Sequence, residues 1–130
     1  MTNISVILVS GGGPSSSAAT NVELLHTNGS RICSLPDFPY GRDAHTQTGV
    51  TACGGGGSDS PTTCHTLSST GSWEVSHNLS LGRVHHSAWD SPQGTVLLGG
   101  EVTNSALTTS EILLESGDTT PGFNLDDKIR

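Results

Sequence analysis

The chain has 130 residues, enough for one ordinary domain, and no segment approaches the ~20 apolar residues that cross a bilayer. Its formal net charge is −7, with 5 lysines and arginines and no basic run, which argues against nucleic-acid phosphates or anionic membranes as partners. Hydrophobic residues make up 32% and aromatic residues 4%, beside 17 glycines, so the predicted core is Leu, Val and Ile in packed β-sheets with tight turns.

The pattern along the chain predicts short strands separated by turns. The apolar run at 4–9 has no basic segment before it and leads into glycines, which indicates a strand and not a signal peptide. The adjacent β-branched Thr108 and Thr109 favour a strand over a helix for 105–115. The predicted strands, in chain order, cover residues 5–10, 21–26, 31–35, 44–48, 50–53, 63–67, 73–76, 85–90, 95–98, 108–114 and 122–125.

Three markers recur in the same order at a spacing of a little over 40 residues. The first is a glycine cluster that closes an apolar run, the second is a turn with Gly beside Ser, and the third is Gly-Arg-x-x-His. They stand at 11–13, 54–57 and 99–100, at 27–30 and 69–72, and at 41–45 and 82–86. This period is typical of propeller blades and is too long for leucine-rich repeats.

With its glycine doublets, Trp73 and the two Arg/His connections, the chain resembles the kelch-repeat family over nearly its whole length. The resemblance implies an all-β fold, a partial kelch-type β-propeller made of four-stranded antiparallel blades. Residues 1–41 would form a partial blade lacking its first strand, and 42–82 and 83–130 would each form a full blade. Arg31 and Phe123 stand where the first and third blades would carry the tryptophan. Propellers close with ~4–8 blades, so the chain would need missing blades or self-association.

The resemblance also implies a non-catalytic scaffold that binds a protein partner through loops on one propeller face. Arg42 and Arg83 could bind carboxylates of that partner; alternatively, each pairs internally with an acid or a backbone carbonyl between blades. Trp89 is expected in the core. The predicted partner-binding residues are Arg42, Arg83, Tyr40, Ser58, Asp59 and Asn104. The predicted structural glycines, where a bend needs positive φ and close backbone approach, are Gly12, Gly13, Gly54, Gly55, Gly99 and Gly100.

No enzyme motif is visible: the chain has neither a GxSxG elbow nor a phosphate-binding GxxxxGK sequence. No catalytic residue, cofactor or metal site is predicted, and the repeated His45 and His86 are expected to make structural hydrogen bonds. The alternative is a fragment of a propeller oxidase or other enzyme whose active residues lie outside this chain.

Cys53 and Cys64 flank the glycine cluster on neighbouring predicted strands, so a disulfide between them is geometrically possible. Two buried thiols in a reducing compartment are the alternative, and a zinc site with His65 lacks a second ligand pair. Cys33 is expected to pack as a small hydrophobe or to pair outside the chain. Asn-x-Ser sequons start at Asn3, Asn28 and Asn78 and would carry glycans only in a secreted protein. Secreted and cytoplasmic settings fit the sequence equally.

Overall fold

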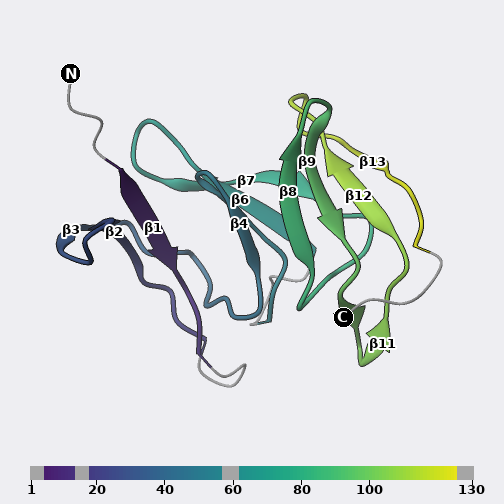
Figure 1. The fold of residues 1–130 in the computed structure, drawn as a ribbon, viewed down its shortest axis with the longest axis horizontal. Helices are drawn as coiled ribbons and strands as arrows, with labels where there is room; N and C mark the ends of the chain where they lie inside the picture. Colours follow the sequence, from purple (N-terminus) through teal and green to yellow (C-terminus); the bar gives the residue numbers. More distant parts are fainter. Residues whose placement is uncertain (1–4, 14–17, 57–61, 126–130) are drawn as a thin grey trace.

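The computed structural model describes residues 5–13, 18–56 and 62–125, and their regular structure is entirely β, arranged as successive antiparallel sheets (Figure 1). The all-β prediction and the four-stranded antiparallel sheets are therefore confirmed. The first sheet has three strands: β1 (Val6–Ser10), β2 (Val22–His26) and β3 (Arg31–Leu35). The second has four strands: β4 (Thr46–Thr48), β5 (Thr51–Cys53), β6 (Thr63–Leu67) and β7 (Trp73–Asn78). The third also has four: β8 (Ser87–Ser91), β9 (Gly94–Leu98), β12 (Ser110–Leu113) and β13 (Thr119–Pro121).

Between β9 and β12 the chain makes a small hairpin that the sequence pattern did not predict. It pairs β10 (Glu101–Val102) with β11 (Ser105–Ala106). Thr103 and Asn104 at its tip both have positive φ, +48° and +61°, as a two-residue hairpin turn requires. The hairpin projects at the lower edge of Figure 1, at the end of β9.

Within each large sheet, strands that follow one another in the chain lie side by side, so the connections collect at two opposite edges. One edge carries tight turns such as Asn28-Gly29, where Gly29 N donates to His26 O at 2.8 Å. The other edge, which we call the loop edge, carries the glycine clusters, the Arg/His connections and the β10–β11 hairpin. Backbone hydrogen bonds tie these segments together, for example Gly12 N to Arg42 O at 2.7 Å and Val84 N to Glu101 O at 3.0 Å.

The core lies between the sheets in two apolar clusters. Between the first and second sheets, Val22, Phe38 and Ala52 are buried, and Trp73 packs against them. Trp73 also anchors the second sheet to the chain before it, because its indole N–H donates to Pro36 O at 2.7 Å and its ring lies 4.5 Å from Phe38. Between the second and third sheets, the buried cluster is Cys53, Cys64, Leu79, Leu97 and Leu113.

Two predictions for the third sheet were wrong. Its outer strand is β13 and not 122–125, because the turn after β12 is closed by Leu114 N to Asp118 O at 2.9 Å, which starts the returning strand at Thr119. Thr119 therefore stands where Trp73 stands in the second sheet, each as the first residue of its outer strand. Trp89 is not in the core: it is 38% exposed and leans on Phe123, with 6.4 Å between ring centroids.

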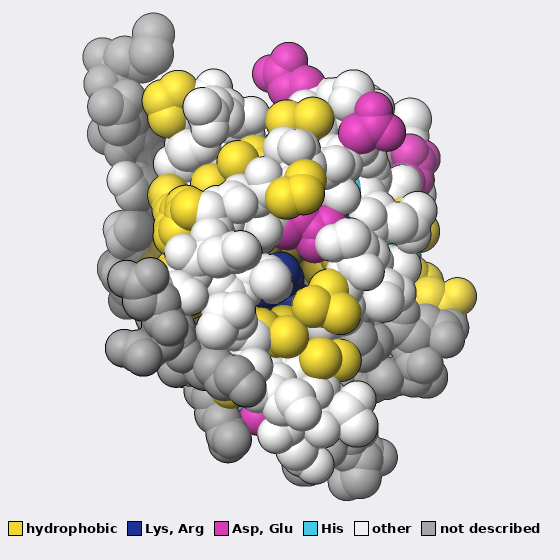
Figure 2. Space-filling model, turned by 90° about the vertical axis from the view of Figure 1, so that its right-hand side faces the viewer, with side chains coloured by type: hydrophobic (Ala, Val, Ile, Leu, Met, Phe, Trp, Pro, Cys, Tyr) yellow, Lys and Arg dark blue, Asp and Glu magenta, His cyan; other side chains and the backbone are white. Residues whose placement is uncertain are grey.

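Both ends of the stack of sheets expose apolar side chains. The first sheet leaves Val6, Ile7, Val9 and Ile32 each more than 40% exposed. Figure 2 looks onto the opposite end, on the side of the third sheet, where hydrophobic side chains surround a basic and an acidic group. Among the described residues there is no helix that could span a membrane.

Candidate binding site

Two buried arginines organise the loop edge from inside. Arg42 and Arg83 are 0% and 1% exposed. Arg42 donates through Nη1 to Gly54 O (2.8 Å) and Thr63 O (3.1 Å), and through Nη2 to Thr63 Oγ1 (3.1 Å). Arg83 repeats this pattern on Gly99 O (2.8 Å), Thr109 O (2.9 Å) and Thr109 Oγ1 (2.9 Å). Each guanidinium thus joins the glycine end of one strand to the start of the next.

These contacts decide between the two roles that the sequence left open for the arginines. Their buried guanidinium groups hold backbone carbonyls and are not presented to a partner, so their assignment as partner-binding residues is corrected. Burial without a full set of counter-charges lowers the pKa of Arg42 to about 10. Burial also lowers the pKa of Arg83, with nearby Glu111 acting in the opposite direction.

The glycine clusters pack against the following Arg/His connection, and they do so twice with the same geometry. A Cβ on Gly11 would lie 2.5 Å from Arg42 O and 2.9 Å from His45 Cε1. A Cβ on Gly54 would lie 2.5 Å from Arg83 O and 2.8 Å from His86 Cε1. Only glycine permits such an approach, and both glycines also have positive φ, +61° and +63°.

The second glycine of each doublet packs against the connection of its own sheet in the same repeated way. A Cβ on Gly55 would meet Asp43 O at 2.4 Å, and one on Gly100 would meet Val84 O at 2.5 Å. Of the predicted structural glycines, Gly12 and Gly13 also have positive φ, although a Cβ on Gly12 would meet nothing within 4 Å. Within the glycine clusters, a Cβ would therefore come within 2.5 Å of a backbone oxygen at Gly11, Gly54, Gly55 and Gly100.

The repeated histidines are wedged between these segments and hydrogen-bonded to the preceding sheet. His45 Nε2 pairs with Ser10 Oγ at 3.1 Å, and His86 Nε2 pairs with Thr46 Oγ1 at 2.7 Å. Burial lowers the pKa of His86 to about 4, with Arg83, His45 and His85 adding to the effect. The pKa of His45 is lowered by burial and by Arg42. Both side chains are therefore neutral at pH 7, as a structural hydrogen-bonding role requires.

A hollow of about 290 Å³ opens on the loop edge between the second and third sheets. His85 closes one side through Nδ1, 2.9 Å from Glu101 Oε1. Asp43 contributes a carboxylate whose buried Oδ1 has no hydrogen-bond partner among the described residues. The hollow carries two carboxyl groups, those of Asp43 and Glu101. Its full lining is Asp43, Ala44, Gly56, Val84, His85, Glu101 and Asn104.

Of the predicted partner-binding residues, two are accessible at the loop edge. Asn104 is exposed and lines the hollow, and Tyr40 is 40% exposed with its ring 6.3 Å from that of His65. Ser58 and Asp59 lie outside the described residues. Sequence reasoning missed Asp43, His85 and Glu101; their positions next to repeated Arg, His and Gly residues were the available signal.

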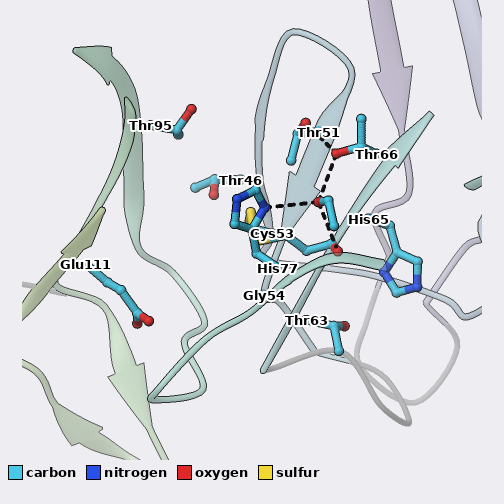
Figure 3. The surroundings of a disulfide bond; sticks show 12 residues. Thr46, Thr51, Cys53, Gly54, Thr63, His65, Thr66, His77, Thr95 and Glu111 are labelled. Atoms are coloured by element: carbon cyan, nitrogen blue, oxygen red, sulfur yellow. Dashed lines mark hydrogen bonds between the residues drawn. A yellow bond between two sulfur atoms is a disulfide. The ribbon is translucent and has the colours of Figure 1, made fainter. Parts of the chain in front are cut away.

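Cys53 and Cys64 form a disulfide across β5 and β6, directly opposite each other in the sheet register, with Cα atoms 4.1 Å apart. Of the two alternatives that the sequence left open for these cysteines, the structure has the disulfide and not two free thiols. Figure 3 shows its surroundings, where hydroxyl groups link the strands of the second sheet: Thr51 Oγ1 lies 2.8 Å from Thr66 Oγ1, which donates to Ser76 Oγ at 2.9 Å. His77 Nε2 then reaches Leu114 O of the third sheet at 2.8 Å.

Cys33 carries a free and exposed thiol on β3, so it does not pack as a small hydrophobe in this structure; the alternative, pairing outside the chain, stays a prediction. In the described part of the chain, no group of three or more His, Cys, Asp or Glu residues is placed to hold a metal ion.

Comparison with known proteins gives no match, either to a protein-family model or to a curated protein.

Proposed function

We propose that the chain is a run of kelch-type propeller units that serves as a non-catalytic scaffold and binds a protein partner through its loop edge. The contact of a glycine doublet with the next Arg/His connection supports the propeller part of the proposal. That contact recurs with equivalent partners and distances. The placement of the second sheet relative to the first therefore resembles the placement of the third relative to the second. A repeated step of this kind is what an arrangement of blades around an axis requires.

Within the part of the chain that the structure describes, the third sheet does not make the equivalent contact. Gly12 N donates to Arg42 O at 2.7 Å and Gly55 N donates to Arg83 O at 2.8 Å, each to the connection that follows. Gly100 occupies the equivalent position and is buried, but its N–H has no acceptor among the described residues. A buried amide of this kind calls for a partner, which supports docking of a further unit with the same connection.

One observation supports the binding role: the loop edge presents an acidic hollow with an exposed rim, on a framework that the buried arginines hold from inside. The buried arginines and histidines hold the loops, so Tyr40 and Asn104 remain available on a rigid support. Binding residues carried on loops over a rigid scaffold are the common arrangement in such proteins.

A peptide selection tests the binding role. The immobilised chain is panned against a displayed library of random peptides, and the site of each binder is mapped by chemical-shift changes in the labelled chain. We expect the shifts to centre on the loop edge. Tyr40→Ala should weaken binding by at least about fivefold, the level of an anchoring residue. Gln93→Ala, on the turn edge, is the matched control and should leave affinity unchanged. Binders that map to the turn edge or to the end faces would refute the proposal.

A further inference from the structure

The turn between β2 and β3 presents an Asn-x-Ser triplet in an open position. Asn28, Gly29 and Ser30 are all exposed. Asn28 Oδ1 accepts hydrogen bonds from Ser30 N (2.9 Å) and from Ser30 Oγ (2.8 Å). The asparagine and the hydroxyl group that define the triplet therefore lie together. Gly29 has space around it, because a Cβ there would meet nothing within 4 Å.

The disulfide supplies an independent observation about the chain's surroundings. The side chains of Cys53 and Cys64 are 2% and 0% exposed, and the bond joins two central strands of the second sheet. Disulfides form and persist in oxidising compartments such as the secretory pathway and are rare in the cytosol. In eukaryotic cells the same pathway attaches glycans to Asn-x-Ser triplets.

We propose that Asn28 is an N-glycan acceptor. The co-reactant is an oligosaccharide activated as a polyprenyl pyrophosphate. A bond forms between Asn28 Nδ2 and C1 of the first sugar, the bond from C1 to the pyrophosphate oxygen breaks, Nδ2 loses one proton, and the lipid pyrophosphate leaves with the electron pair. A glycan on this turn covers no packed surface, because the neighbouring Thr27 and Arg31 are exposed as well.

Asn78 belongs to a second Asn-x-Ser triplet, whose middle residue is buried and whose backbone is hydrogen-bonded to the third sheet. Its side chain is exposed at the end of β7, but Leu79 is only 6% exposed and belongs to the core between the second and third sheets. Ser80 N donates to Glu111 Oε2 at 2.7 Å, which fixes the triplet against the third sheet. Asn78 is therefore an internal comparison, with the same motif but a pinned backbone. Asn3 lies outside the described residues.

The test expresses the 130-residue chain behind a cleavable secretion signal in cultured eukaryotic cells. Intact mass before and after glycosidase treatment measures the glycan, and peptide mass spectrometry locates it. We expect a glycan on Asn28 in most molecules, its loss in Asn28→Gln and Ser30→Ala, and its retention in Ser30→Thr. Asn78→Gln should leave the mass of the attached glycan unchanged.

Two controls distinguish an unmodified folded chain from one that failed to fold or to be secreted. Alkylation without reductant reports whether Cys53 and Cys64 are paired, and cell-free translation with microsomes gives the same glycan readout if the chain is not secreted. Disulfide-bonded chain with unmodified Asn28, or glycan located on Asn78 in its place, would overturn the proposal.

Discussion

The second and third sheets build the same arginine anchor from different neighbours. Arg42 and Arg83 bind equivalent carbonyls, those of Thr63 and Thr109. Two residues after that threonine stands His65 in the second sheet and Glu111 in the third. His65 Nδ1 accepts from Arg42, whereas Glu111 accepts from the backbone N–H of Ser80. The equivalent of Ser80 in the preceding connection is Pro39, which has no N–H to offer.

This comparison separates what the repeat needs from what it tolerates. The anchor needs the arginine, the glycine carbonyl and the threonine, which are the same in both sheets. The charge beside the anchor differs between the two sheets. In the third sheet the Glu111 carboxylate accepts the backbone N–H of Ser80. In the second sheet the equivalent residue is Pro39, which has no N–H, and a neutral His65 stands in place of the carboxylate. Experiments that affect the two sheets unequally therefore test the account.

The largest difference is expected from removing the arginines. Arg83→Met should cost roughly 3–5 kcal/mol of unfolding free energy, because it strands equivalent acceptors and also removes the positive charge that lies near the buried Glu111 carboxylate. Arg42→Met should cost about 1–3 kcal/mol, because it strands neutral acceptors only. Chemical denaturation measures both. Arg31→Met is the control: Arg31 is exposed and pairs with Glu23 at 3.5 Å, so little change is expected. Equal losses for Arg42 and Arg83 would contradict the role given to Glu111.

A matched glycine pair separates backbone conformation from close approach. Gly55 and Gly71 have similar φ, +89° and +85°, but a Cβ would meet Asp43 O at 2.4 Å on Gly55 and nothing within 4 Å on Gly71. Alanine at either position should cost about 1–2 kcal/mol for the positive φ. Gly55→Ala should cost roughly 1–3 kcal/mol more through overpacking. Thermal unfolding of both variants measures the difference, and similar melting temperatures would count against tight packing at the loop edge.

The disulfide distinguishes the second sheet from its neighbours at one position. The equivalent facing pairs are Ser10 with Val22 in the first sheet and Leu98 with Ser110 in the third. Replacing Cys53 and Cys64 together by alanine should lower stability by about 3 kcal/mol in the loop-entropy model. Hydrogen exchange should then show faster opening of β5 and β6 than of β9 and β12. Uniform loss of protection over all the sheets would mean that the bond does not act locally.

The smallest change in folding stability near neutral pH is expected from protonation of the buried histidines. Burial lowers the pKa of His65 to about 4, with Arg42 adding to the effect, and the pKa of His86 is also lowered to about 4. The unfolded chain binds protons from about pH 6.5 downward while the folded chain does not, so stability should fall between about pH 6.5 and 4. His65→Asn, which keeps an acceptor for Arg42, should reduce this slope. Denaturation across that pH range measures it, and a flat profile for the unmodified chain would contradict burial of neutral histidines.

Much of the fold was predictable because it rests on local signals. The strands 31–35 and 63–67 were predicted to the residue, since alternating side chains and glycine turns bound them closely. The outer strand of the third sheet was not, because the turn at 115–118 sets its register and the apolar Phe123 drew the prediction further along. The role of the arginines depends on contacts between segments that lie 12–26 residues apart, which a sequence pattern alone leaves open.

One contact, between a glycine cluster and the next Arg/His connection, relates each sheet to the following one in the same way. Selective labelling of glycine and histidine, followed by nuclear Overhauser spectroscopy of the intact chain, tests it most directly. The account predicts two cross-peaks, from Gly11 Hα to His45 Hε1 and from Gly54 Hα to His86 Hε1, because both pairs are in van der Waals contact. Absence of both peaks, or the presence of only one, would contradict it.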